Sequence, residues 1–378
     1  MATIPTEHDA AALARRLLSW VRPPTAANRL KAKRQDSGGE PSAGPKRINL
    51  ALQGGGAHGA FTWGVLDGLL ADGRLTVDGI SGTSAGAVNA VMLAHGLATR
   101  GADGARECLA AFWNATGHSS GLPSLQRDVV DRLFPFFPGR AWFDAVAQFW
   151  GPQQFNPLNI NPLKELIERF VDFDAIRRGR HPLFIAATNV ETGDLRIFTR
   201  DDISAEAVMA SAALPTLFRA VEIDGAPYWD GGYTANPPLT PFLRATETED
   251  VLLVQINPLT RSGAPADSNG IASRASEISF NTALLADLRA VDFVNRMIDD
   301  GRLPRGTAAG HYRRIRLHRI VLDGNGELFD ARSKATVDRE FFAHLHALGE
   351  DAARRFLTAH FDDLGRRSTL GDVSGAAA

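Results

Sequence analysis

The distribution of apolar and polar positions predicts short strands that alternate with longer helices along most of the chain. Apolar runs of strand length are followed by segments with helical periodicity, and glycine or proline marks most of the changes. Such alternation is typical of a mostly parallel sheet with helices on both faces, so we expect an α/β fold with three layers, α/β/α. The predicted strands are 48–52, 77–80, 183–188, 195–198, 221–223, 251–256 and 316–321, and the predicted helices are 57–70, 85–97, 205–212, 280–298 and 337–361.

Two segments depart from this pattern and set the expected domain boundaries. Residues 1–45 join a short amphipathic stretch to basic residues and a Ser/Gly/Pro-rich piece, which predicts a mobile basic tail. Residues of about 120–165 are dense in aromatic residues and prolines, which predicts a cap over a site or, alternatively, a small subdomain core. We therefore expect a catalytic domain at 46–260 that contains the cap, and a helical C-terminal extension at 261–378 that packs on it.

Composition and charge narrow the class of protein. The chain has 378 residues, 44% of them hydrophobic, and 41 basic against 43 acidic residues give a net charge of -2. A sizeable core is therefore possible, and a nucleic-acid partner is not expected. The single Cys108 excludes an intrachain disulfide and a Cys-rich zinc site. Without a secretory signal or an apolar stretch of roughly 18 residues, we expect a cytoplasmic protein whose tail and aromatic segment could touch a membrane surface.

One turn carries the clearest chemical signal. The apolar run 77–80 leads into Gly82-Thr83-Ser84-Ala85-Gly86, and a helix is predicted directly afterwards. A serine on a sharp turn between a strand and a helix exposes its hydroxyl. The helix N-terminus adds free N–H groups and a partial positive charge, which favour an oxyanion. Ser84 is therefore the candidate nucleophile for acyl transfer.

Two further glycine turns supply the other groups that acyl transfer needs. Gly54, Gly55 and Gly56 follow the first predicted strand and precede a helix, so their backbone N–H groups can converge on an anion as an oxyanion hole. Asp230 lies in the turn Tyr228-Trp229-Asp230-Gly231-Gly232 and is the candidate general base. Taken alone, an Asp-Gly-Gly sequence is most often an ordinary turn.

The order and separation of these motifs resemble the patatin-like phospholipase family, in its bacterial type. The resemblance covers about 46–245. Several motifs in the order and at the separations of the family are far more specific evidence than any single motif. The matching segments are Gly54-Gly55-Gly56-Ala57-His58-Gly59, the GTSAG turn around Ser84, Ser211-Ala212-Ala213-Leu214-Pro215, Asp230-Gly231-Gly232 and Asn236-Pro237-Pro238.

The resemblance implies a patatin-like fold and a catalytic dyad of Ser84 and Asp230, with Gly54, Gly55 and Gly56 as the oxyanion hole. The implied activity is that of a lipid acyl hydrolase, of phospholipase A or lysophospholipase type, which needs no metal or other cofactor. His58 departs from the pattern, because many members carry Arg or Lys there and a fixed positive charge is then absent. Head group, acyl position, chain length and oligomeric state are not defined by the sequence.

Three rival interpretations remain open at this stage. Gly54, Gly56 and Gly59 also match a dinucleotide fingerprint, with Asp78 as the acid that binds the ribose. An α/β-hydrolase with a Ser-His-Asp triad would need its histidine after the acid, and His311 or His318 would have to serve. These two histidines lie in an Arg-rich run that is more typical of a solvated edge strand. A third alternative is a non-catalytic scaffold that docks on a lipid surface.

Overall fold

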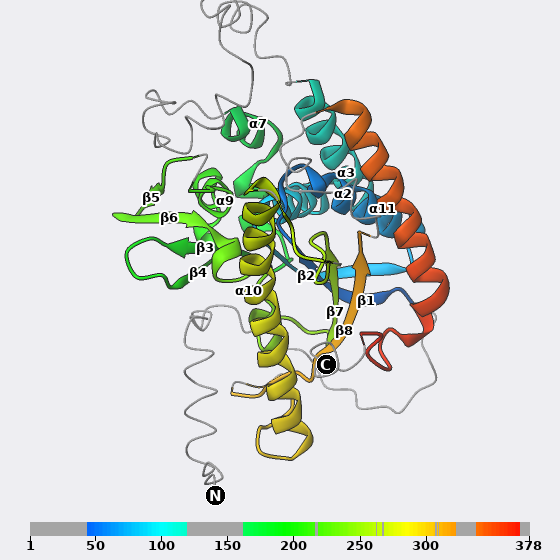
Figure 1. Ribbon diagram of the computed structural model, residues 1–378. Helices are drawn as coiled ribbons and strands as arrows, with labels where there is room; N and C mark the ends of the chain where they lie inside the picture. The colour runs from blue at the N-terminus through cyan, green and yellow to red at the C-terminus, as the bar shows by residue number, and fades with distance from the viewer. Residues whose placement is uncertain are drawn as a thin grey trace, which may run out of the picture.

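The computed structural model describes residues 44–118, 162–215, 218–261, 263–266, 268–306, 308, 310–322 and 338–370 (Figure 1). The expected mobile tail and aromatic cap therefore lie outside the described residues, except for 44–45 and 162–165. No helix within these ranges is long and apolar enough to span a membrane.

Among the described residues, eight strands form one mixed sheet in the order β5-β6-β3-β2-β1-β7-β8, with β4 paired to β3. β3, β2, β1, β7 and β8 run parallel, whereas β4, β5 and β6 join by antiparallel pairing. This arrangement confirms the expected α/β fold with a mostly parallel sheet. The strands are β1 (Lys46–Leu52), β2 (Leu75–Gly82), β3 (Leu183–Asn189), β4 (Leu195–Thr199), β5 (Val221–Ile223), β6 (Ala226–Asp230), β7 (Asp250–Gln255) and β8 (Arg316–Val321).

Helices cover both faces of this sheet (Figure 1). The α-helices are α2 (Gly59–Asp72), α3 (Ala85–His118), α7 (Pro162–Phe170), α8 (Phe173–Arg178), α9 (Ala205–Ser211), α10 (Ser268–Asp299) and α11 (Arg339–His360). Single turns of 3-10 helix are η1 (Gly56–His58), η2 (Arg200–Asp202), η3 (Gly231–Tyr233), η4 (Thr240–Leu243) and η6 (Phe361–Asp363).

Side chains that alternate along the central strands divide the core into two layers. Leu50 and Leu52 of β1 belong to the core that α2, α3 and α11 share, whereas Ala51 belongs to the core under α10. Leu252 and Leu253 of β7 divide between the two layers in the same way. A strand buried on both faces is expected for the centre of a parallel sheet.

The last helix of the described chain packs directly on the first. A Cβ at Gly64 of α2 would lie 2.0 Å from the His346 carbonyl oxygen of α11, and one at Gly349 of α11 would lie 2.2 Å from the Phe61 carbonyl oxygen. Glycine at both positions therefore lets the two backbones touch. The chain after residue 260 thus contributes two long helices and the edge strand β8 to the same layered structure.

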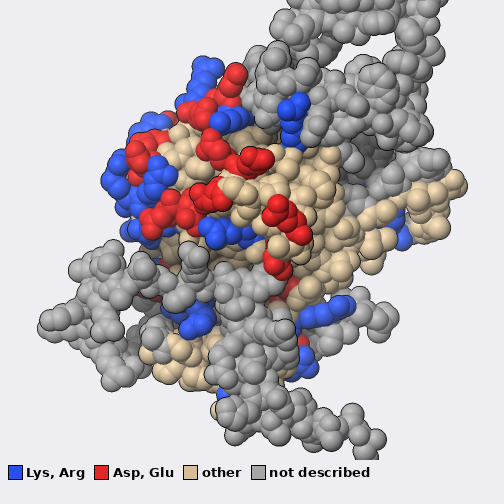
Figure 2. All heavy atoms as spheres, turned by 90° about the vertical axis from the view of Figure 1, so that its left-hand side faces the viewer, with Lys and Arg blue, Asp and Glu red and all other residues tan. Residues whose placement is uncertain are grey.

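Charged side chains do not form a field of one sign on the face that Figure 2 shows. Acidic and basic residues lie interspersed in its upper left part, and uncharged residues cover much of the remaining described surface. Mixed charges of this kind agree with the net charge of -2. The described residues of this face therefore give no electrostatic reason to expect nucleic-acid binding.

Candidate active site

The turns that carry Ser84 and Asp230 meet at one edge of β3. β4 pairs with 184–188 of β3, so β2 and β6 must share the opposite edge of this strand. On that edge, β2 ends with Gly82 opposite Ile185, and β6 arrives from the other direction and ends with Asp230 opposite Ala187. The two strand ends therefore face each other across two residues of β3, roughly 7 Å.

Ser84 occupies a strained turn between β2 and α3. Its φ of 55° lies in the left-handed region, which is uncommon for a residue with a side chain. A Cβ at Gly86 would lie 2.0 Å from the Leu52 carbonyl oxygen, so only glycine permits this tight turn against β1. The Ser84 amide donates to the Ser211 Oγ at 2.9 Å, which fixes the turn from the side of α9. The side chain of Ser84 keeps a small exposed fraction, 8%.

Asp230 is fully buried at the end of β6. Its Oδ1 accepts a hydrogen bond from the Gly232 amide at 2.7 Å, and its own amide donates to the Ala213 carbonyl at 2.9 Å. Thr188 donates from its hydroxyl to the Asp230 carbonyl oxygen at 2.8 Å. The backbone and one carboxylate oxygen of Asp230 are therefore fixed.

The other carboxylate oxygen of Asp230 has different surroundings. Burial raises the pKa of Asp230 to about 7, although the Gly232 amide and the Ser84 hydroxyl both lower it. Oδ2 is buried and meets no donor in good hydrogen-bond geometry among the described residues. The Ser84 hydroxyl lies close enough to interact with the carboxyl group. This pair has the chemistry of a hydroxyl beside a base.

The three glycines of the first turn have different surroundings. The Gly54 amide donates to the Asn236 Oδ1 at 2.7 Å, and the Gly54 carbonyl accepts from the Asn257 Nδ2 at 2.7 Å. A Cβ at Gly54 would lie 2.8 Å from the Ser84 Cβ, so this turn packs directly on the nucleophile. Within the described chain, the amides of Gly55 and Gly56 donate to no other group. These two amides are therefore available to an anion, whereas that of Gly54 is not.

Asn236, Ser211 and Asn257 contact the site but received no individual role from the sequence. The Asn236 Oδ1 accepts from the Gly54 amide, and its Nδ2 is buried without a partner among the described residues. Ser211 and Asn257 carried no predicted role. Asparagine and serine are common in turns, so residue type alone does not identify these three, all of which are fully buried.

The residues of the rival interpretations are engaged elsewhere. His318 is fully buried rather than solvated, and its Nε2 lies 3.0 Å from the Asp250 Oδ1 at the first residue of β7. Gly82, close to Ser84, pairs with Leu52 of β1, which in turn pairs with Val254 of β7. Val254 lies four residues after Asp250, about 13 Å along the strand, so Asp250 and its His318 contact lie toward the opposite end of the sheet from Ser84. His311 precedes β8 and lies beside Gly306, at the same end.

Asp78 does not occupy the position that a ribose-binding acid needs. Its Oδ2 accepts from the amides of Glu247 and Thr248 at 2.7 Å each, and its Oδ1 accepts from Arg47 at 2.5 Å. This carboxylate lies in the middle of β2 and ties the turn before β7 to the sheet. The dinucleotide interpretation therefore loses its ribose ligand.

One group of side chains within the described ranges has the composition of a metal site. Ligand atoms of Asp67, His346 and Glu350 lie within 4.8 Å of one another where α2 meets α11. Arg106 also pairs with Asp67, at 2.5 Å. Burial raises the pKa of the Asp67 carboxyl group, but the interactions with His346 and Arg106 outweigh burial, so the pKa is lowered. The group is therefore accounted for as an ion-pair cluster between helices.

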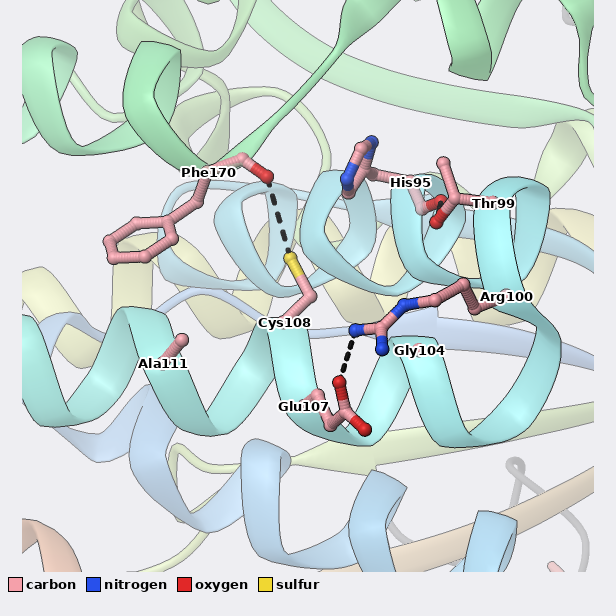
Figure 3. A pocket seen from close by; sticks show the side chains of 8 residues that line it. All are labelled: His95, Thr99, Arg100, Gly104, Glu107, Cys108, Ala111 and Phe170. Atoms are coloured by element: carbon pink, nitrogen blue, oxygen red, sulfur yellow. Dashed lines mark hydrogen bonds and ion pairs between the residues drawn. The ribbon is translucent and has the colours of Figure 1, made fainter.

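A cavity of about 260 Å³ lies away from Ser84, where the two halves of α3 meet α7 (Figure 3). Its wall includes His95, Arg100 and Cys108. The Cys108 thiol donates to the Phe170 carbonyl oxygen at 3.7 Å, and burial raises the pKa of this thiol to about 11. A protonated thiol is a weak nucleophile, so this cavity does not form a second covalent site.

Comparisons with known proteins agree with the motifs. A family model described as patatin-like phospholipase matches residues 50–243, just over half of the chain. No curated protein matches the chain. Among solved structures, VipD from Legionella pneumophila matches at 16% identity and a TM-score of 0.39, over 84% of this chain and 67% of that chain.

A second similar structure is the heterodimeric ExoU-SpcU complex from the type III secretion system of Pseudomonas aeruginosa. It matches at 17% identity and a TM-score of 0.36, over 84% of this chain and 52% of that chain. The type III effector protein ExoU matches at 16% identity and a TM-score of 0.33, over 83% and 53%. This chain therefore spans about half the length of the ExoU chains.

Proposed function

The chain belongs to the patatin-like phospholipase family, a family of lipid hydrolases, and we propose that it hydrolyses lipid acyl esters with Ser84 and Asp230 as its catalytic dyad. Phospholipids or lysophospholipids are the proposed substrates, and no metal or other cofactor takes part. The proposed catalytic domain is 46–260, and the chain from 261 onwards is proposed as an extension that packs on it.

The observation that carries this proposal is the state of the Asp230 carboxyl group. Burial raises its pKa to about 7, and the Ser84 hydroxyl lies close enough to interact with this carboxyl group. A general base acts best when its pKa is near the working pH, since it is then ionised and still basic enough to take a proton. An exposed aspartate, with a pKa near 4, would be a much weaker base.

The proposed reaction has two balanced steps. The Ser84 oxygen attacks the ester carbonyl carbon and transfers its proton to the Asp230 Oδ2, while the amides of Gly55 and Gly56 stabilise the negative carbonyl oxygen. The tetrahedral intermediate then collapses, Asp230 returns the proton to the departing alcohol, and an acyl-Ser84 ester remains. In the second step Asp230 takes a proton from water, the hydroxide attacks the acyl carbon, and Ser84 leaves with that proton.

The test compares the full chain with Ser84→Ala and Asp230→Asn. Asp224→Asn, a substitution in an exposed turn, serves as the control. Each protein is tested separately with a fluorophosphonate probe, a short p-nitrophenyl ester and mixed phospholipid vesicles. We expect both dyad variants to lose hydrolysis by at least about 10³-fold and the control to keep it, since removing any member of a catalytic unit has costs of this order. Probe labelling of Ser84→Ala at the level of the wild type, or full activity of Asp230→Asn, would refute the dyad.

Product analysis defines the substrate. Fatty acid and lysophospholipid released by the wild type but not by Ser84→Ala would identify a phospholipase A activity. Hydrolysis of the soluble ester without any action on phospholipid or lysophospholipid would remove phospholipids as the substrate and leave a smaller ester in their place.

A further inference from the structure

The chain that follows β7 lies against the first glycine turn. Asn257, two residues beyond the end of β7, is fully buried, and its Nδ2 donates to the Gly54 carbonyl oxygen at 2.7 Å. Gly55 contacts the same segment, because a Cβ there would lie 2.7 Å from the Ile256 Cδ1 and 3.6 Å from the Asn257 Oδ1. Residues 256–257 therefore pack directly on the turn that supplies the candidate oxyanion hole.

The hydrogen bond from Asn257 sets the direction of the Gly55 amide. The Gly54 carbonyl and the Gly55 N–H belong to one peptide unit, and in a planar trans unit these two groups point in opposite directions. A carbonyl held toward Asn257 therefore directs the Gly55 N–H away from Asn257. Within the described chain this amide donates to no other group, so it is one of the two amides available to an anion.

The glycine turn does not hold this peptide unit by itself. Glycine adopts positive and negative φ about equally readily, so steric barriers to rotation of the unit between Gly54 and Gly55 are low. Stabilisation of an oxyanion requires donors that are already oriented before the reaction. A rotation that broke the bond from Asn257 would leave a buried carbonyl without its donor, which is unfavourable. The side chain of Asn257 therefore supplies an orientation that the glycines lack.

Asn257 is itself held in place by two buried glutamines. Its amide donates to the Gln53 Oε1 at 2.8 Å, and its carbonyl oxygen accepts from the Gln255 Nε2 at 2.8 Å. The Gln53 Oε1 also accepts from the Ile256 amide at 2.8 Å. Because the Gly54 carbonyl can only accept, the carboxamide of Asn257 must turn its nitrogen toward it. Both the backbone and the side chain of Asn257 are therefore fixed.

We propose that Asn257 is a positioning residue for acyl transfer, which aims the Gly55 amide at the carbonyl oxygen of the substrate through its bond to the Gly54 carbonyl. This inference rests on the proposed function, because the direction of the Gly55 amide matters only if an oxyanion forms. Asn257 lies beyond the residues 50–243 that match the family model. The chain after this match therefore contributes to the site as well as to the sheet.

Steady-state kinetics on a soluble p-nitrophenyl ester test this role. Asn257→Ala removes the donor, and Asn257→Leu removes it while it keeps a side chain of similar shape. Each variant should lower kcat about 10–100-fold and leave KM within about twofold, since the oriented amide acts in the transition state and Gly56 still donates.

Asn49→Ala is the matched control for these variants. Asn49 of β1 is also fully buried, and its Nδ2 donates to the Thr248 carbonyl oxygen at 3.1 Å, away from the glycine turn. The control should lower the Tm as the Asn257 variants do, because it also leaves a buried carbonyl without this donor. Its kcat should remain that of the wild type.

A trifluoromethyl ketone separates the orientation of the donor from a general loss of structure. Such a ketone forms a tetrahedral adduct with a nucleophilic serine, and its oxyanion resembles the transition state. Its Ki should rise in the Asn257 variants by about the factor by which kcat/KM falls. The pH midpoint of kcat/KM should stay at about 7, because Asp230 is unchanged.

The outcomes distinguish this inference from the proposed function. An active wild type together with Asn257→Ala or Asn257→Leu of unchanged kcat would overturn the positioning role and leave the dyad standing. An equal loss of kcat in Asn49→Ala, or a ketone Ki that stays constant while kcat falls, would also overturn it, since loss of structure would then explain the rates. A wild type that hydrolyses no ester would overturn the function and the positioning role together.

Discussion

Asp230→Asn should stabilise the protein at alkaline pH while it abolishes catalysis. A carboxyl group whose pKa rises from 3.8 to about 7 on folding costs about 4 kcal/mol of stability once it is ionised. Because the raised pKa favours the protonated form, this cost is absent below about pH 4, grows as the pH rises, and is complete above about pH 7. Asparagine never ionises and therefore avoids it.

The amide of the variant has a cost of its own, which sets the net magnitude. Oδ2 of Asp230 has no hydrogen-bond partner among the described residues, so a buried NH2 group at this position lacks a fixed acceptor and costs roughly 1–3 kcal/mol. The variant should therefore be about 1–3 kcal/mol more stable than the wild type at about pH 8.5. At about pH 4, where the carboxyl group is protonated in the folded state and half protonated in the unfolded state, most of this cost has vanished and the order should reverse. A gain of this size raises the Tm of a 378-residue chain by roughly 1–4 °C.

Thermal unfolding at the two pH values, followed by circular dichroism, measures this reversal. Asp224→Asn serves as the control, because the same chemical change in an exposed turn should leave the Tm difference independent of pH. The matching kinetic test is kcat/KM of the wild type on a soluble ester, which should rise with pH and level off with a midpoint near 7. A Tm difference that is the same at both pH values, or a rate that is flat between about pH 5 and 8, would refute the raised pKa of Asp230.

The remaining predictions concern residues around and away from the dyad. Asn236→Ala removes the acceptor of the Gly54 amide and should lower kcat by about 10–100-fold with little change in KM, whereas Asn236→Asp keeps the acceptor and should retain more activity. His318→Ala should lower the Tm but preserve ester hydrolysis, since its partner is Asp250; loss of activity in the folded variant would favour a triad. Iodoacetamide at neutral pH should leave Cys108 unmodified by intact mass, because its pKa is about 11.

Local periodicity was sufficient for most of the fold, and its failures have physical reasons. The predictions for 221–223 and 316–321 match β5 and β8, and the other predicted strands differ from the observed ones by at most two residues at either end. β6 was missed because Ala226–Asp230 is short and contains a proline, and because it pairs with the distant β3 as well as with β5. The helix predicted to end at 97 is the first half of α3, which continues to His118. Arg100 and Gly101 have a non-helical backbone, so the helical periodicity stops there although the helix continues after the kink.

Part of the candidate site could be predicted from local sequence, and the rest depends on tertiary packing. Ser84, Asp230 and the glycines 54–56 lie in turns with local signatures, and the structure brings these turns together. The partners that orient them come from elsewhere in the chain: Ser211 reaches the Ser84 amide from 127 residues away, and Asn236 reaches Gly54 from 182 residues away. Nothing in the spacing of these residues indicates such contacts, because they follow from how α9 and the loop after η3 pack on the sheet.

Several features of this site cost stability, and their coincidence supports a catalytic rather than a structural role. The left-handed backbone of Ser84 costs on the order of 1–3 kcal/mol, and the buried Asp230 costs more once ionised. Asn236 adds an unpaired buried Nδ2 close to both. A scaffold that only docks on lipid does not need these destabilising features, since a single substitution at each position could remove them. Acyl transfer needs the first two, because the strained turn presents the hydroxyl and the dry carboxyl group supplies a base at neutral pH.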